Sequence, residues 1–162
     1  MVTTRALSAS WRSGGGGLVT SEAEALRIAR AAKRVAVLGI KTEKQANQAA
    51  FYVPEYLQSV GINVIPVPVY FPDVTHILDA KCYRSISANP DAHEIDIVDV
   101  FRRPKDLHQH LDDIIAAKPK SVWLQSGITD KAFEEAVAAA GILVVSDRCL
   151  LLDHQQAMTS SL

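Results

Sequence analysis

The sequence predicts an α/β protein, a Rossmann-like doubly wound sheet of about five parallel strands with helices on both faces. Strand-sized apolar runs alternate with helical patterns of roughly 10 to 15 residues, which is the arrangement of successive βαβ units. Crossovers between parallel strands are right-handed, so the helices are expected to cover both faces of the sheet. Four apolar runs each end at a small polar or basic cluster. These runs cover residues 35–38, 95–100, 122–124 and 143–145.

The size and charge of the chain restrict its class. With 162 residues and a formal net charge of −1, it fits one globular, soluble domain and not a nucleic-acid-binding protein. Its apolar runs are far shorter than the roughly 20 residues of a membrane-spanning helix, so no membrane segment is expected. Cys82 and Cys149 lack the pattern of a disulfide framework or a zinc site. A reducing, cytoplasmic location is therefore the first expectation.

The N-terminal residues have a different composition from the rest. They contain a four-glycine run at residues 14–17, many small or hydroxyl side chains and no acidic residue before Glu22. This composition is typical of a flexible tail, which we expect over residues 1–19, with one domain over residues 20–162. The alternative is an organelle transit peptide, which would place the protein in an organelle matrix.

The first half of the domain begins with a helix, because Ser21 and Glu24 have capping-box spacing before an apolar pattern. A buried strand follows over residues 34–39. A helix is then expected over residues 47–59, where Pro54 requires either a start near Tyr52 or a kink. The next strand covers residues 62–67.

The middle of the chain, residues 68–93, is expected to be mostly loop, because Pro66, Pro68 and Pro72 prevent regular strand pairing. A helical turn over residues 74–78 and a short extended piece over residues 81–86 are expected within it.

The second half predicts a strand over residues 94–101, a proline-initiated helix over residues 104–117 and a strand over residues 121–125. Thr129 is expected to cap a helix over residues 130–140, and the last strand covers residues 142–146.

The carboxyl ends of the predicted strands would form one edge, which is where open α/β sheets bind ligands. The loop Gly39-Ile40-Lys41-Thr42 follows the first strand, and a helix N-terminus after it would attract phosphate. The loop keeps only the first glycine of a G-x-G-x-x-G dinucleotide motif. The second strand ends in Val67 and Pro68 where an NAD site would place an acidic residue, which argues against NAD.

Three strings together resemble the single-domain CoA-binding protein family, which is similar to the N-terminal domain of the succinyl-CoA synthetase alpha subunit. They are Val-Asp-Val-Phe-Arg-Arg at residues 98–103, Trp-x-Gln-x-Gly at residues 123–127 and Asp-Arg-Cys at residues 147–149. The resemblance extends from about residue 35 to residue 153. It implies that the ligand is CoA or acyl-CoA, whose phosphates are recognised by Arg and Lys side chains.

The resemblance also implies the site residues. The phosphate loop would consist of Gly39, Ile40, Lys41 and Thr42, and Val67 would contact the ligand at the end of the second strand. The crevice after the third strand would be lined by Phe101, Arg102 and Arg103. The pantetheine arm or thiol would be contacted by Gln125, Ser126 and Gly127. The chain differs from many family members at residues 43–46 and at residues 68–72. In the second of these segments, Tyr70 or Phe71 would either stack on the adenine or cover the core.

Individual side chains have alternative roles. Arg102 or Arg103 would either contact the ligand or pair with Asp99 or Asp147. Asp99, inside an apolar strand, needs a hydrogen-bond partner and is expected to brace loops. Cys149 is either an inert buried thiol or a partner for CoA in a mixed disulfide. Two further side chains, His108 and His110, do not share a helix face, so no metal site is expected.

The function that these features favour is a non-catalytic CoA or acyl-CoA sensor or carrier that presents its ligand to an unknown protein partner. One alternative is an enzyme that acts on an acyl-CoA together with a partner subunit. Another is a pyridine-nucleotide-binding sensor. A homodimer through the first helix is compatible with this scheme, and nucleic-acid or membrane partners are not expected.

Overall fold

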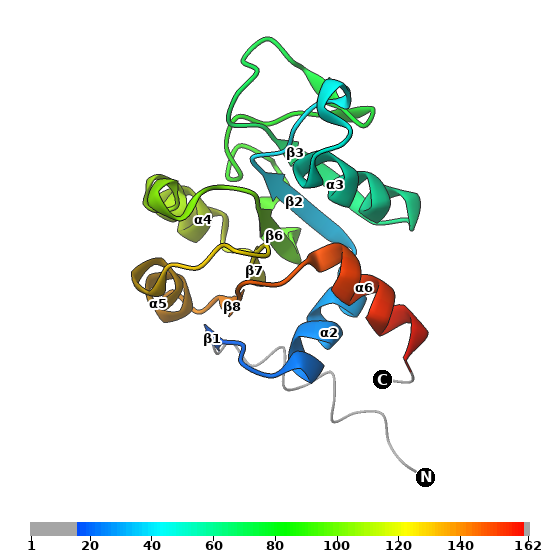
Figure 1. The fold of residues 1–162 in the computed structure, drawn as a ribbon. Coiled ribbons are helices and arrows are strands. Elements are labelled where there is room, and N and C mark those ends of the chain that lie inside the picture. Colours follow the sequence, from blue (N-terminus) through cyan, green and yellow to red (C-terminus); the bar gives the residue numbers. More distant parts are fainter. Residues whose placement is uncertain (1–15, 161–162) are drawn as a thin grey trace.

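A six-stranded parallel sheet lies between two layers of helices in the computed structural model, which describes residues 16–160 (Figure 1). Every pair of neighbouring strands is parallel. The predicted Rossmann-like α/β fold is therefore confirmed. From one edge to the other, the strands are β1 (Gly17–Leu18), β8 (Leu143–Val145), β7 (Ser121–Leu124), β6 (Ile97–Val100), β2 (Arg34–Leu38) and β3 (Asn63–Val67).

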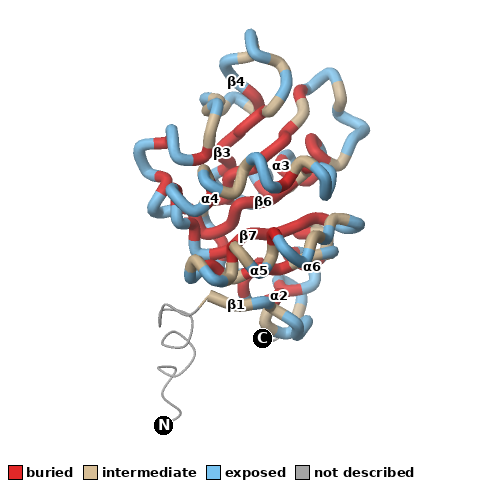
Figure 2. The backbone as a smooth tube through the Cα atoms, turned by 90° about the vertical axis from the view of Figure 1, so that its left-hand side faces the viewer, coloured by how far each residue is buried: buried red, intermediate tan, exposed pale blue. Residues whose placement is uncertain are grey.

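The central strands are apolar along their whole length because helices cover both of their faces. All residues of β6 and β7 are buried, and Figure 2 shows the buried segments gathered in the middle of the molecule. One face packs against α2 (Glu22–Ala31), α3 (Ala49–Ser59) and α6 (Leu150–Thr159). The other packs against α4 (Leu111–Ala117) and α5 (Lys131–Ala139).

Strand β1 is the sixth strand, which the sequence did not predict. The backbone N–H of Gly17 donates to Ile142 O at 3.3 Å, and that of Val19 donates to Val144 O at 2.8 Å. A Cβ on Gly16 would lie 2.3 Å from Ala138 O, so there is no room for a side chain at position 16, where the backbone approaches the end of α5. The tail boundary predicted at residue 19 is thus too late, and residues 1–15 of that tail lie outside the described residues.

Two helix starts show how well the caps were predicted. Ser21 caps α2 as expected, since its Oγ accepts a hydrogen bond from the Glu24 backbone N–H. At α5 the cap is Asp130 and not Thr129, because the Asp130 carboxylate accepts the backbone N–H of Phe133 at 2.8 Å. Helix α6 was missed altogether, because its N-cap Cys149 makes no side-chain cap bond.

The helix predicted over residues 104–117 is shorter than expected. Two 3₁₀ turns, Pro104–Asp106 and His108–His110, precede α4, and none of these segments has a side-chain cap. The helix predicted over residues 47–59 is confirmed as α3 and contains Pro54.

The loop between β3 and β6 contains an antiparallel hairpin where a helical turn was expected. Its strands are β4 (His76–Ile77) and β5 (Ala80–Lys81). Leu78 and Asp79 connect them with φ values of 54° and 58°, which is the backbone of a two-residue turn with both central residues left-handed. Short 3₁₀ turns at Glu43–Gln45 and Ala92–Glu94 complete the connections. No helix within residues 16–160 is long and apolar enough to cross a membrane.

Candidate binding site at the carboxyl edge of the sheet

The ends of four strands are held together by backbone hydrogen bonds at the carboxyl edge. Gly39 N donates to Val67 O at 2.9 Å and Phe101 N donates to Leu38 O at 2.9 Å, which ties the ends of β2, β3 and β6 together. Gln125 N donates to Val100 O at 3.4 Å and adds the end of β7. The topology thus brings together the loops that contain the predicted site residues.

Gly39 lets the first loop pass close to the end of β6. Its φ is 86°, a conformation that L side chains rarely adopt. A Cβ at this position would lie 2.5 Å from Phe101 O and 3.2 Å from Arg102 Cδ. Glycine is therefore required here both by the backbone conformation and by the approach of the two loops.

Of the first loop, Lys41 is the residue that offers a charged side chain to a ligand. Ile40 is buried in the core, so it could meet a ligand only through its backbone. Thr42 forms a capping box with Gln45: its Oγ1 donates to Gln45 Oε1 at 2.7 Å, and its backbone N–H donates to the same oxygen. The expected helix N-terminus is only the three-residue 3₁₀ turn here, so the loop relies on Lys41.

Two cations converge on Tyr70. Lys41 Nζ lies 5.0 Å from the centre of the Tyr70 ring and 5.6 Å from that of Phe71. Arg102 Cζ lies 5.5 Å from the Tyr70 ring, and Arg102 Nη1 donates to Tyr70 Oη at 3.3 Å. That hydrogen bond lowers the pKa of Tyr70. Half of Tyr70 is exposed, so it covers the cations and not the core.

Arg102 and Arg103 share one carboxylate, Asp106. Arg103 Nε donates to Asp106 Oδ2 at 2.9 Å, and Arg102 Nη2 lies 3.9 Å from the same oxygen. The suggested pairing with Asp99 or Asp147 is therefore wrong. Arg103 is largely exposed, whereas Arg102 is 8% exposed.

Arg102 is also held from a second side. Its Nε donates to His110 Nε2 at 3.1 Å. Burial and the Arg102 charge lower the pKa of His110, which keeps its ring neutral and able to accept this bond. Arg102 is thus a fixed cation on which the end of β6 and the following turns are arranged.

The loop after β7 is fastened by two acidic side chains. The carboxamide of Gln125 donates to Asp99 Oδ1 at 2.6 Å, and Gly127 N donates to Asp147 Oδ1 at 2.7 Å. Ser126, between them, is exposed. Asp99 braces this loop as expected, yet it is fully buried, and burial raises its pKa to about 7.

The other histidines do not form a metal site. His108 pairs with Asp130 at 3.3 Å, whereas His110 contacts Arg102. In the part of the chain that the structure describes, no three or more His, Cys, Asp or Glu side chains are grouped to hold a metal ion.

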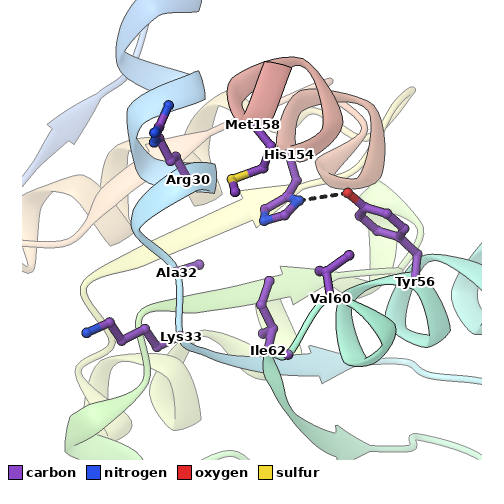
Figure 3. Close-up of a pocket in the computed structure, with 9 residues that line it drawn as sticks. Arg30, Ala32, Lys33, Tyr56, Val60, Ile62, His154 and Met158 are labelled. Carbon is purple, nitrogen blue, oxygen red and sulfur yellow. Dashed lines mark hydrogen bonds between the residues drawn. The ribbon is translucent and has the colours of Figure 1, made fainter. Parts of the chain in front are cut away.

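A pocket of about 350 Å³ lies at the opposite edge of the sheet, where β2 and β3 begin. Figure 3 shows the His154 ring beside this pocket, with Nδ1 facing the Tyr56 hydroxyl at 2.8 Å. The sequence offered no signal for this pair, since 98 residues separate its members. The pocket is lined by Arg30, Ala32, Lys33, Tyr56, Val60, Gly61, Ile62, His154 and Met158.

Comparison with known proteins gives consistent matches. A curated relative, the uncharacterized protein YneT of Bacillus subtilis, is 27% identical over 134 residues, which are 83% of this chain and 94% of YneT. A Thermus thermophilus protein of known structure is 36% identical, with a TM-score of 0.75 over 85% of this chain and 99% of that one. A hypothetical protein from Pyrococcus horikoshii is 26% identical, with a TM-score of 0.74 over 86% and 93%.

Residues 33–155 match the CoA binding domain family, so the match covers every strand except β1 and every loop of the carboxyl edge. It includes the three strings on which the sequence resemblance was based. This chain belongs to the CoA binding domain family.

Proposed function

We propose that the chain binds CoA or acyl-CoA at the carboxyl edge of its sheet and acts as a sensor or carrier of this ligand. The observation that carries the proposal is the convergence of Lys41 and Arg102 on the exposed ring of Tyr70. These residues come from loops after three different strands, and together they offer positive charge beside an aromatic surface. CoA requires that combination, because its adenine lies next to phosphates.

The phosphates are assigned to Lys41 and Arg103. The Lys41 ammonium contacts aromatic rings and forms no ion pair with a carboxylate among the described residues. Arg103 is exposed, and among residues 16–160 it bonds only to Asp106, so a phosphate can draw its guanidinium away at little cost. Arg102 stays with His110 and adds charge without moving.

The pantetheine arm is assigned to the loop after β7. Ser126 is exposed and Gln125 places a carboxamide beside it, which are polar groups suited to the amides and sulfur of pantetheine. The phosphate end of the site, after β2, and the pantetheine end, after β7, are separated by one strand, because β2, β6 and β7 are adjacent in that order.

A pyridine nucleotide is the second candidate, and Val67 weighs against it. This residue closes β3, where a dinucleotide site places an acid on the ribose, and it is 1% exposed and apolar. The third candidate is an enzyme that acts on an acyl-CoA with a partner subunit. Adding acyl-CoA and following release of free thiol would detect it.

The test is isothermal titration of the chain with CoA, dephospho-CoA and NAD at one salt concentration. We expect CoA to bind most tightly, and Lys41→Ala and Arg103→Ala each to weaken CoA about tenfold or more, since a hydrogen bond to a charged group contributes about 1.5–3 kcal/mol. Arg27→Ala, an exposed cation on α2, is the matched control and should leave binding unchanged. Equal binding of NAD and CoA, or binding of none of the three, would overturn the proposal.

A further inference from the structure

Asp99 is an unusual residue within the central strands. It lies on β6 between Val37 of β2 and Trp123 of β7, and all three residues are fully buried. Its Oδ1 accepts one hydrogen bond, from Gln125 Nε2 at 2.6 Å. Its Oδ2 is the one buried side-chain polar atom without a partner in the described part of the chain. A carboxylate in such a place is unfavourable when ionised.

No cation compensates for this carboxylate. Burial is the main cause of its raised pKa of about 7, and no charged side chain contributes to it. The ionisable groups on or next to the helices of this face bond elsewhere or are exposed. Arg148 pairs with Asp153 and Glu22, His154 bonds to Tyr56, Arg30 bonds to carbonyls of α6, and Glu55 is exposed. When Asp99 gains or loses a proton, the contact that changes is therefore its hydrogen bond with Gln125.

The carboxamide of Gln125 has two ends with opposite character. Nε2 is a donor and Oε1 is an acceptor. With Asp99 ionised, Nε2 must face it, since a carboxylate only accepts. Gln125 Oε1 has no hydrogen bond within residues 16–160, and it does not belong to the buried atoms without a partner, so this atom of an otherwise buried residue contacts solvent at the end of β7. The crevice then contains an acceptor.

Protonation of Asp99 allows this arrangement to reverse. A carboxylic acid has an O–H to donate, and Gln125 Oε1 is the acceptor within reach once the carboxamide turns over. The turn brings Nε2 to the crevice, where it offers a donor. One proton on a buried strand residue thereby changes the polarity of the group at the ligand-binding edge.

We propose that Asp99 and Gln125 form a proton-dependent selector for the terminal group of the bound CoA. With Asp99 ionised, Gln125 Oε1 accepts from the thiol S–H of free CoA. With Asp99 protonated, Gln125 Nε2 donates to the carbonyl of an acyl-CoA thioester. Asp99 is a positioning residue in this scheme, because it acts on the ligand only through Gln125. The inference rests on the proposed CoA site.

The response of Gln125 to the proton on Asp99 is tested without ligand by NMR of the Gln125 side-chain amide. We expect its two proton resonances to titrate with a midpoint near pH 7 in the native chain and to stay constant in Asp99→Asn, which is neutral at every pH. Asp112→Asn, an exposed acid on α4, serves as the control and should keep the native titration. Amide resonances of the native chain that do not respond between pH 5.5 and 8.0 would overturn the proposal.

The selectivity is tested by the ratio of the dissociation constants of acetyl-CoA and CoA between pH 5.5 and 8.0. Both ligands contain the same phosphates, so phosphate titration cancels in the ratio. We expect the native chain to shift toward acetyl-CoA by about tenfold as the pH falls, because the group that Gln125 then presents no longer matches the hydrogen-bonding character of the free thiol. In Asp99→Asn the ratio should not depend on pH.

The outcomes separate the two proposals. If neither ligand binds at any pH, the CoA site fails and the selectivity fails with it, while the amide resonances still show whether Gln125 responds to the proton on Asp99. If both ligands bind and the native ratio is constant, the selector is wrong and the CoA site stands. A pH-dependent ratio that persists in Asp99→Asn would assign the effect to another group and would also overturn the selector.

Discussion

The backbone N–H of Lys41 donates to the carbonyl oxygen of Ala50 at 3.1 Å, which ties the first loop to helix α3. This carbonyl is free because of Pro54. In a regular helix Ala50 O would accept the N–H of the residue four positions later, and Pro54 has none. The proline that made the helix doubtful in the sequence thus provides the acceptor that holds the loop containing Lys41.

Pro54→Ala tests this link. The new N–H at position 54 would compete for Ala50 O, so the Lys41 amide would lose its partner for part of the time. We expect hydrogen exchange at Lys41 to accelerate about fivefold, because a hydrogen bond contributes about 1 kcal/mol. The amide of Gly39, which bonds to Val67 O, should be unaffected. Unchanged exchange at Lys41 would show that the proline does not control the loop.

Gly39→Ala and Gly61→Ala form a matched pair. Both glycines have φ near 90°, yet nothing lies within 4 Å of a Cβ at Gly61, whereas a Cβ at Gly39 would be 2.5 Å from Phe101 O. We expect Gly61→Ala to lower the free energy of unfolding by about 1 kcal/mol from backbone strain alone. Gly39→Ala should cost about 3 kcal/mol or more and weaken CoA binding. Urea denaturation measures the free energy of unfolding of both variants. Similar losses in the two variants would contradict the close approach of Gly39 to Phe101.

The strands and their shared edge were predictable because buried parallel strands are apolar throughout and end at polar loops. The family strings at residues 98–103 and 123–127 then indicated the ligand. Strand β1 was not predictable, since Gly17 and Leu18 join the sheet through backbone bonds that leave no side-chain pattern. Helix α6 was also hidden, because it is stabilised by packing on α2 and not by a cap.

Side-chain partners were the least predictable part of the site. Asp99 was expected to need a hydrogen bond, but its partner Gln125 lies 26 residues away on another strand end. Arg102 and Arg103 pair with Asp106, a local acid on the 3₁₀ turn, and not with Asp99 or Asp147, which were considered from the sequence. Such choices depend on which groups remain after the loops pack, and spacing alone does not encode them.

Two tyrosines should ionise in a defined order. The hydrogen bond and charge of Arg102 lower the pKa of Tyr70, and burial raises the pKa of Tyr56. We therefore expect Tyr70 to ionise before Tyr56 in an absorbance titration of the phenolate. Assignment comes from Tyr70→Phe, which should remove the first phase of the titration, and Arg102→Lys should move that phase to higher pH. A first phase that is unchanged from the native chain in Tyr70→Phe would contradict the Arg102 contact.

Asp99 should make the fold less stable as the pH rises from about 4 to about 7. Its pKa is raised to about 7 in the folded chain and is near 3.9 when unfolded, so the folded state binds more protons in this range. The penalty at pH 7 and above reaches up to about 4 kcal/mol, at 1.36 kcal/mol for each pKa unit. Asp99→Asn should recover part of it, seen as a higher urea midpoint at pH 8 and little gain at pH 4. A variant less stable than the native chain at pH 8 would refute this assignment.

His154 should act in the opposite direction. Burial lowers the pKa of His154 in the folded chain. Below the pKa of about 6.5 that the residue has in the unfolded chain, the unfolded state binds more protons, so the fold becomes less stable as the pH falls. His154→Leu removes this dependence, but it leaves the hydroxyl of Tyr56 without its partner at a cost of about 1–3 kcal/mol. The variant should therefore be less stable than the native chain at pH 8, and the difference should shrink as the pH falls below 6.5. His93→Ala, an exposed histidine, should follow the native curve throughout. A difference between native chain and His154→Leu that stays constant from pH 8 to pH 5 would mean that His154 is not held neutral by its burial.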